Sequence, residues 1–288
     1  MKIYEENHNL IIENPRDFDL IQTFDCGQCF RWDKTADGYV GVCYGKALKI
    51  SKSGNRIVLK NTSISDWNEI FARYFDMDRD YTEIKAILSQ DDKMKEAISF
   101  GEGIRILNQE PFEALISFII SASNNIPRIK KIIKSLCENF GDKIHYDGEV
   151  FYSFPTAEKL STLSLGEIDV IKSGFRGKYI LACAKAVSSG QIDLECLKNA
   201  SYDYAKAELL KLSGVGTKVA DCVLLFGLSK YSGFPVDVWI KRIMEYCYFG
   251  KETPKEDISA FAKDKFGELG GFAQQYLFYW ARENKIGV

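Results

Sequence analysis

The sequence predicts an α+β fold in which an antiparallel β-sheet precedes a larger helical part. Residues 1–75 contain short β-favouring runs that are separated by turn signals such as Asp37-Gly38. From about Asp66 onward, apolar residues recur with the spacing of helices. The 288 residues suffice for one large or two modest domains with a substantial core. We therefore expect a sheet domain at residues 1–75 and a helical domain at residues 76–288.

The expected strands are five short runs rich in β-branched and aromatic residues. They are residues 10–12, 29–32, 39–43, 47–50 and 57–59. The sequence Gly-Gln-Cys-Phe-Arg-Trp at residues 27–32 stands out because a glycine lies beside aromatic residues. Such a glycine marks either a bulge or a close approach of another group to the backbone. The pattern alone leaves both interpretations of Gly27 open.

A helical hairpin is expected at residues 204–228. The amphipathic run at residues 204–212 stops at Ser-Gly214-Val215-Gly216, where the two glycines allow a tight turn, and Thr217 can cap the next helix. The backbone N–H groups from Val215 onward then face outward and can bind one phosphate. The glycine spacing fits neither a Rossmann fingerprint nor a P-loop. A helix-hairpin-helix that grips a nucleic-acid backbone and a plain helical turn remain equal alternatives.

Lys218 and Asp237 are the candidate catalytic residues. A lysine in the first helical turn is poorly placed because the helix dipole there favours anions, so Lys218 indicates a purpose other than helix stability. A partly desolvated lysine can form Schiff bases, although Lys218 could also hold a phosphate as a point charge. Asp237 is expected to cap the following helix. Its carboxylate could also stabilise a cationic sugar or help to move protons.

The overall charge excludes a nonspecific basic DNA coat. The formal net charge is −2, so any nucleic-acid surface must be local, as in the basic cluster that begins at Arg128. That cluster could equally be a solvated helix face. No apolar run is long enough to span a bilayer, and the N-terminus lacks the blocks of a signal peptide. We expect an intracellular monomer without a membrane partner, in the cytoplasm or nucleoid of a prokaryote or the nucleus of a eukaryote.

The eight cysteines are expected to be reduced thiols. Cys26 and Cys29 have the spacing of half a zinc site, but no second pair shares it, and the chain has only two histidines. No cysteine follows Cys247, which argues against a C-terminal iron–sulfur loop. We therefore expect neither zinc nor an iron–sulfur cluster, and no organic cofactor.

The sequence Gly-Val-Gly-Thr-Lys at residues 214–218, followed by Val-Asp at 236–237, closely resembles the helix-hairpin-helix DNA glycosylases. The similarity is to the 8-oxoguanine DNA glycosylase and AP lyase family, whose fold is an N-terminal sheet packed on a two-part helical domain. The resemblance implies that Lys218 attacks the anomeric carbon, expels the damaged base and forms the imine from which the strand is cleaved. Asp237 would be the essential carboxylate. The implied partner is duplex DNA that contains 8-oxoguanine, preferentially opposite cytosine.

The same resemblance implies a base pocket. Gly27 lies in the family's G-Q-x-F-R-W stretch, where the glycine carbonyl accepts the hydrogen that 8-oxoguanine carries on N7. Gln274 and Phe278 lie in Gly-x-Ala-Gln-x-x-Leu-Phe, whose glutamine reads the Watson–Crick edge and whose phenylalanine stacks on the base. They are four residues apart and share a helix face. Cys222 would lie against the base, four residues after Lys218.

Four residues are implied to contact DNA opposite the lesion. Asn124 and Arg128 match the family's Asn-Asn-Asn-Ile-x-Arg, although Ser123 replaces the first asparagine. They would fill the hole left by the flipped base and contact the cytosine. Phe175 would wedge between base pairs in place of the family's tyrosine, and Arg176 would be a second reader of cytosine.

The superfamily commonly binds a monovalent or divalent cation through carbonyls of the hairpin turn, here near Leu210, Leu212 and Val215. Two other functions remain open. One is a glycosylase of the same fold for other oxidised or alkylated bases. The other is a noncatalytic helix-hairpin-helix protein that binds DNA.

Overall fold

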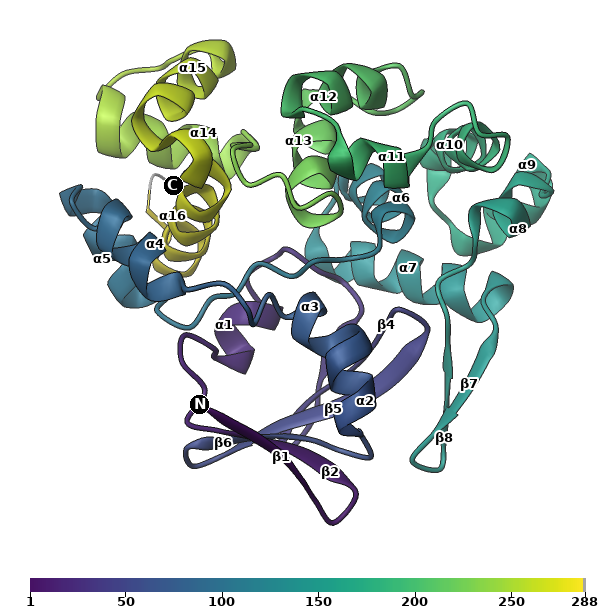
Figure 1. The fold of residues 1–288 in the computed structure, drawn as a ribbon. Coiled ribbons are helices and arrows are strands. Elements are labelled where there is room, and N and C mark those ends of the chain that lie inside the picture. The colour runs from purple at the N-terminus through teal and green to yellow at the C-terminus, as the bar shows by residue number, and fades with distance from the viewer. Residues whose placement is uncertain (287–288) are drawn as a thin grey trace.

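A computed structural model describes residues 1–286. A six-stranded antiparallel sheet lies beneath a helical body in Figure 1. The helices form two lobes: one contains α6 to α13, and the other joins α4 and α5 to the C-terminal helices α14 to α16. Segments far apart in the sequence therefore lie side by side in the second lobe. The α+β expectation, including its two-part helical domain, is confirmed.

The sheet has the strand order β1-β2-β6-β5-β4-β3, and every neighbouring pair is antiparallel. Its strands are β1 (Lys2–Glu6), β2 (Asn9–Glu13), β3 (Trp32–Lys34), β4 (Gly38–Cys43), β5 (Lys46–Ser53) and β6 (Arg56–Leu59). Strand β1 was not expected. The strand expected at residues 29–32 is wrong in extent, because β3 only begins at Trp32. Phe30 instead packs edge-on against Phe118 of the helical body, with ring centroids 5.8 Å apart.

An aromatic cluster fills the space between the sheet and the short helices that follow it. Trp32 stacks on Phe24 with ring centroids 4.2 Å apart, and its indole N–H donates to the hydroxyl of Tyr74. Phe71 and Phe75 complete the cluster from the segment after the sheet. The core of the sheet part therefore includes helical residues close to the expected boundary at residue 75.

The helices occupy most of the remaining chain. The N-terminal set is α1 (Leu20–Phe24), α2 (Ile64–Asp66), α3 (Ala72–Tyr74), α4 (Tyr81–Leu88), α5 (Asp92–Phe100), α6 (Pro111–Ser121) and α7 (Ile126–Phe140). The C-terminal set is α8 (Ala157–Ser161), α9 (Leu165–Ile168), α10 (Gly177–Ser188), α11 (Leu194–Asn199), α12 (Tyr202–Leu210), α13 (Thr217–Phe226), α14 (Val238–Met244), α15 (Lys255–Phe266) and α16 (Gly270–Asn284). Within residues 1–286 no helix has the length and apolarity that a membrane span requires.

A β-hairpin interrupts the helical part, which the sequence did not predict. Strands β7 (Lys143–Tyr146) and β8 (Glu149–Tyr152) extend down beside the main sheet (Figure 1). The hydroxyl of Tyr146 donates to the Lys60 carbonyl and accepts the Lys49 N–H. The ammonium of Lys49 also lies 2.8 Å from Asp147. The hairpin therefore ties the helical body to the sheet.

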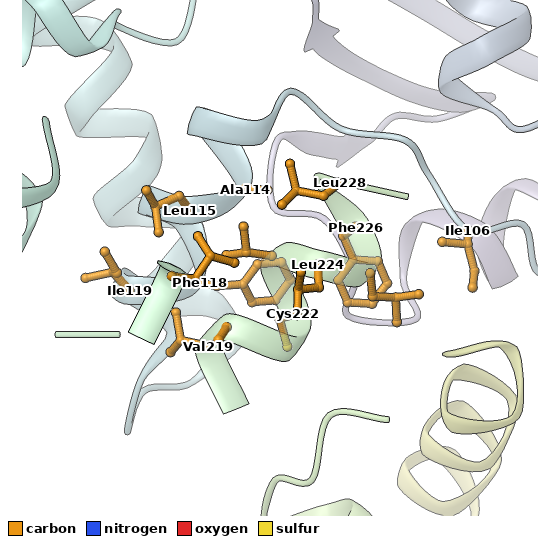
Figure 2. Packing of buried hydrophobic residues seen from close by; sticks show 14 of the residues in the cluster. Ile106, Ala114, Leu115, Phe118, Ile119, Val219, Cys222, Leu224, Phe226 and Leu228 are labelled. Carbon is orange, nitrogen blue, oxygen red and sulfur yellow. The ribbon is translucent and has the colours of Figure 1, made fainter. Parts of the chain in front are cut away.

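Helices α6 and α13 form the centre of the helical core. Figure 2 shows Phe118 of α6 among Val219, Cys222 and Phe226 of α13. The rings of Phe118 and Phe226 stack with centroids 5.4 Å apart. This packing fixes the helix that carries Lys218, because its inward face is buried along its whole length.

Candidate active site

The hairpin between α12 and α13 depends on one glycine. Gly214 has φ of +84°, and a Cβ there would lie 2.5 Å from Cγ of Tyr179. Gly216 is different, since its φ is −93° and a Cβ would meet nothing within 4 Å. The expected cap at Thr217 is wrong by one residue: Gly216 is the N-cap, and no side chain of residues 1–286 caps the helix.

The start of α13 presents free backbone donors. The expectation that the Val215 N–H faces outward is wrong, because it donates to the Leu212 carbonyl at 3.1 Å and closes the turn. From Gly216 to Val219, the N–H groups have no acceptor among residues 1–286. Four successive donors at a helix N-terminus are suited to a phosphate.

Lys218 projects from this first turn and is partly buried. Its ammonium donates to the Ser121 hydroxyl at 3.3 Å and lies 5.1 Å from the centre of the Phe118 ring. The Ser121 hydroxyl in turn donates to the Phe118 carbonyl at 2.8 Å. In the part of the chain that the structure describes, no carboxylate pairs with Lys218. The amine is therefore held by a neutral hydroxyl and an aromatic face.

Asp237 begins α14, and Cys222 lies one helical turn after Lys218 on α13. Asp237 is the N-cap of α14, as expected, and its Oδ1 accepts the Ile240 N–H at 2.8 Å. Burial raises the pKa of the Cys222 thiol to about 11, and the nearby Lys218 ammonium partly offsets this effect. The Asp237 carboxylate raises the pKa of the same thiol. The Lys218 amine and the Asp237 carboxylate at the start of α14 are therefore both close enough to Cys222 of α13 to affect the pKa of its thiol.

The start of helix α16 lies against α13. A Cβ at Gly271 would lie 2.3 Å from the Leu225 side chain, so the two helices approach closely there. Cys222 and Gln274 each lie three residues from this contact, within one helical turn. Gln274 is 6 % exposed, and its buried Oε1 has no hydrogen-bond partner among residues 1–286.

Gly27 lies against the end of α16. Its φ is +85°, and a Cβ would be 3.0 Å from Cε1 of Phe278 and 3.2 Å from Nη1 of Arg282. The close approach that the sequence left open is therefore present, and the group that approaches is the partly exposed ring of Phe278. Gly27 lies in the segment 25–31, which connects α1 to β3. Cys26 of this segment packs in the core of the helical body, and Cys29 packs in the core of the sheet part.

The four residues expected opposite the lesion fall into two groups. Phe175 is 59 % exposed and Arg128 is exposed at the start of α7, so both can reach DNA. Asn124 is already engaged, because its amide donates to the Ile120 carbonyl and accepts the Asn125 N–H.

Arg176 is 3 % exposed, and its guanidinium donates to the carbonyls of Ala122, Ser123 and Ser173. Here it supports the loop between α6 and α7. Direct reading of a base by Arg176 would require it to release some of these carbonyls.

Of the three hairpin carbonyls expected to bind a cation, that of Leu212 is already engaged in a hydrogen bond. The Leu212 carbonyl already accepts the Val215 N–H, which leaves it one lone pair for another ligand. Within residues 1–286, no three or more His, Cys, Asp and Glu side chains are grouped as metal ligands. Any cation at Leu210, Leu212 and Val215 would therefore be held by backbone oxygens, the ligands that hard cations prefer.

The sequence analysis missed several residues that support this site. They are Ser121, Gln109, Gln275 and Arg282. Each supports the site through a residue distant in sequence, and no local motif marks any of them. Gln275 and Arg282 could have been identified only by knowing that α16 lies against the segment 25–28, which the sequence does not show.

Two family models together cover almost the whole chain. Residues 10–115 match the 8-oxoguanine DNA glycosylase N-terminal domain. Residues 116–267 match the HhH-GPD superfamily base excision DNA repair protein. Their junction at residues 115 and 116 lies inside α6, which contributes to the core beneath Lys218.

Relatives of the chain include enzymes and solved complexes. It is 33 % identical to the N-glycosylase/DNA lyase OGG1 of Arabidopsis thaliana, over 89 % of this chain and 75 % of that one. The structure of the Clostridium acetobutylicum 8-oxoguanine glycosylase/lyase in complex with DNA containing cytosine opposite 8-oxoG is 44 % identical, with a TM-score of 0.96 and 99 % of each chain covered. MBOgg1 in complex with a low-affinity DNA ligand is 45 % identical, also with a TM-score of 0.96 over 99 % of each chain. The chain therefore belongs to the HhH-GPD superfamily of base excision DNA repair proteins and carries the N-terminal domain of the 8-oxoguanine DNA glycosylases.

Proposed function

We propose that this protein excises 8-oxoguanine from duplex DNA, preferentially opposite cytosine, and then cleaves the strand as an AP lyase. The observation that carries the proposal is the amine of Lys218, which lies near the Cys222 thiol, is held by the Ser121 hydroxyl and forms no ion pair within residues 1–286. The enzyme relatives support the reaction class, and the likeness to the Clostridium acetobutylicum complex supports the lesion and the opposite base.

In the proposed reaction, the Lys218 ammonium first gives up a proton, and the neutral Nζ then forms a bond to C1′ of the damaged nucleotide. The N-glycosidic bond breaks, and its electron pair leaves with the purine, which takes up a proton. The nitrogen loses a proton, and its lone pair then forms the imine double bond as the bond from C1′ to O4′ breaks and O4′ takes up a proton. A proton then leaves C2′ while the bond from C3′ to its phosphate oxygen breaks. Asp237 stabilises the positive charge that develops on the sugar as the base departs.

Recognition of the base is assigned to the residues around α16. The Gly27 carbonyl accepts the hydrogen on N7 of 8-oxoguanine, whereas guanine presents a lone pair that the carbonyl repels. The amide of Gln274 reads the Watson–Crick edge, and Phe278 stacks on the ring. The buried, unpartnered Oε1 of Gln274 supports its role, because such an atom needs a donor. Cys222 would lie against the base, with the Lys218 ammonium nearby.

The DNA backbone and the opposite strand are assigned to exposed groups. The free N–H groups from Gly216 to Val219 bind one phosphate after the hairpin turn at Gly214. Phe175 enters the base stack, and Arg128 contacts the cytosine. Asn124 and Arg176 hold the loop that presents Arg128. Together these contacts offset the few kcal/mol that base flipping costs.

A monovalent or divalent cation would rigidify the turn by binding the carbonyls of Leu210, Leu212 and Val215. These carbonyls lie at the end of α12 and in the turn itself. The cation would be structural, and none of the chemical steps above passes through it.

A base-release assay tests the function. Duplexes with 8-oxoguanine, an alkylated base or undamaged guanine opposite cytosine are incubated with the protein, and released bases are quantified by chromatography. We expect release of 8-oxoguanine followed by strand cleavage. Release of only the alkylated base would favour a glycosylase of different specificity, and binding without any release would favour a noncatalytic DNA-binding protein.

A further inference from the structure

Side chains donate hydrogen bonds to the backbone carbonyls on both sides of Gly27, but not to the Gly27 carbonyl itself. The Asp25 carbonyl accepts a hydrogen bond from Nη2 of Arg282, and the Cys26 carbonyl accepts one from Nε2 of Gln275 at 3.0 Å. The Gln28 carbonyl accepts one from Nε2 of Gln109 at 2.8 Å. No donor within residues 1–286 reaches the Gly27 carbonyl.

These contacts restrict how the Gly27 carbonyl can point. Peptide groups are planar, so anchoring the carbonyls on both sides of Gly27 limits rotation of the peptide group between them. The side chain of Gln28 adds a further constraint, because it donates to the carbonyls of Thr23 and Arg105 and accepts the Leu107 N–H. The free carbonyl therefore belongs to a segment whose neighbouring carbonyls and Gln28 side chain are fixed by hydrogen bonds.

Two adjacent glutamines on α16 have different roles in this arrangement. Gln275 is 3 % exposed and is bonded to the Cys26 carbonyl, whereas the Oε1 of Gln274 has no partner among residues 1–286. Arg282 lies seven residues after Gln275 and therefore shares its helix face. That face of α16 holds the segment 25–28, while the neighbouring position carries the residue assigned to the base.

Arg282 also connects the segment to the stacking ring. Its guanidinium carbon lies 5.6 Å from the centre of the Phe278 ring, and its Nη1 would be 3.2 Å from a Cβ at Gly27. Glu283 accepts a hydrogen bond from its Nε at 3.0 Å and so helps to fix the guanidinium. One side chain thereby sets the position of both Gly27 and Phe278.

We propose that Gln275 and Arg282 are positioning residues for lesion specificity, and that they act by orienting the free Gly27 carbonyl. This inference rests on the proposed function. The N7–H of 8-oxoguanine forms a good hydrogen bond only if the acceptor lies at the right distance and direction. A carbonyl that is free to rotate would lose that bond and would also repel the N7 lone pair of guanine less effectively. Neither residue touches the reacting atoms.

The test uses the full-length protein with Gln275→Leu and Arg282→Met, each of which removes a donor while keeping most of the side-chain volume. Single-turnover excision is measured on 8-oxoguanine opposite cytosine, and strand cleavage is measured on a preformed abasic site in the same duplex. Binding to lesion and undamaged duplexes is compared in the Lys218→Gln background. Arg282→Lys retains a donor, and Asn284→Leu and Arg56→Met are controls that remove contacts elsewhere.

We expect each donor-removing variant to slow excision of 8-oxoguanine by about tenfold, which corresponds to one lost hydrogen bond. Cleavage at the abasic site should fall much less, because no base is present for the carbonyl to read. The preference for lesion over undamaged duplex should shrink, and Arg282→Lys should recover part of the excision rate. Thermal unfolding of each variant shows whether it is folded, and Gln275→Met provides a second donor-free variant if Gln275→Leu does not fold.

Equal losses on both substrates would show a general structural effect and would overturn the inference, as would unchanged excision in both variants. A different result would show that the proposed function itself is wrong. If the unmodified protein does not release 8-oxoguanine, the function is wrong, and the inference that rests on it is wrong as well.

Discussion

The ring of Phe278 lies so close to Gly27 that a single added carbon would stand 3.0 Å from its Cε1. This contact brings together two segments separated by most of the chain, one after α1 and the other near the end of α16. A flat purine that stacked on Phe278, as proposed, would therefore lie beside the Gly27 backbone. The first prediction follows from this geometry.

Gly27→Ala should abolish most excision of 8-oxoguanine. The methyl group would displace Phe278, and the φ of +85° would add strain of about 1–3 kcal/mol. A displacement of this kind at a reacting complex costs about 10²-fold in rate. Gly45→Ala is the matched control, because its φ is +70° but its Cβ would meet nothing within 4 Å. Single-turnover rates that fall equally in both variants would contradict the role of the contact.

Gly214→Ala should lower the midpoint of thermal unfolding, whereas Gly216→Ala should leave it almost unchanged. At Gly214 the φ of +84° and the 2.5 Å approach to Tyr179 combine strain with a clash, so we expect destabilisation by about 2–5 kcal/mol. At Gly216 the backbone is ordinary and the space is open, so the midpoint should hardly change. Similar midpoints for the two variants would show that the turn tolerates a side chain at Gly214.

Arg128→Ala should reduce the preference for cytosine opposite the lesion. Arg128 is exposed at the start of α7, and a lost base contact is worth about 1–3 kcal/mol of discrimination. Excision rates opposite each of the four bases provide the measurement. Lys134→Ala, an exposed change on the same helix, is the control. A cytosine preference that survives in Arg128→Ala would remove this residue from the role.

Arg176→Ala should instead lower stability by about 1–3 kcal/mol, because three loop carbonyls lose their donor. Urea denaturation measures this change. The loop between α6 and α7 should also become more sensitive to proteases. A variant as stable as the unmodified protein would mean that Arg176 is free to act elsewhere, for example on the base.

Glu110 should make stability depend on pH. Burial, together with the nearby Glu113 carboxylate, raises the pKa of Glu110 to about 7. Between the unfolded pKa of about 4.3 and this value, the folded protein holds a proton that the unfolded chain releases. The contribution of Glu110 is therefore complete below about pH 4.3 and is lost as the pH rises to 7.

Glu110→Gln should remove this loss and should be more stable than the unmodified protein above pH 7, by on the order of 1–3 kcal/mol. Chemical denaturation at a series of pH values measures the difference. Glu102→Gln, an exposed change nearby, is the control. Parallel stability curves for Glu110→Gln and the unmodified protein would exclude this role of Glu110.

The parts of the site that the sequence predicted correctly carry local signals. The two glycines of the hairpin and the N-cap position of Asp237 are features of a few consecutive residues, and the structure contains both the hairpin and the cap. Even here the cap of α13 was misplaced by one residue, because glycine and threonine are both acceptable caps.

The parts that the sequence missed depend on contacts across the chain. Gln275 and Arg282 act on carbonyls about 250 residues earlier, so nothing in their own neighbourhood marks them. Arg176 was predicted to be a second reader of cytosine, and the sequence could not reveal its hydrogen bonds to the carbonyls of Ala122 and Ser123. Phe30 is an aromatic residue of the kind that favours strands, but it packs against Phe118 of the helical body and does not join the sheet. In each case tertiary packing overrides the local pattern.

The central claim is that the amine of Lys218 becomes covalently linked to deoxyribose. Borohydride reduction in the presence of a duplex with 8-oxoguanine opposite cytosine, followed by peptide mass spectrometry, tests it directly. We predict a protein–DNA adduct located on Lys218 and none with Lys218→Gln, whereas Lys211→Gln, a change at an exposed lysine of the same hairpin, should be trapped normally. An adduct that persists in Lys218→Gln, or the absence of any adduct with the unmodified protein, would contradict the account.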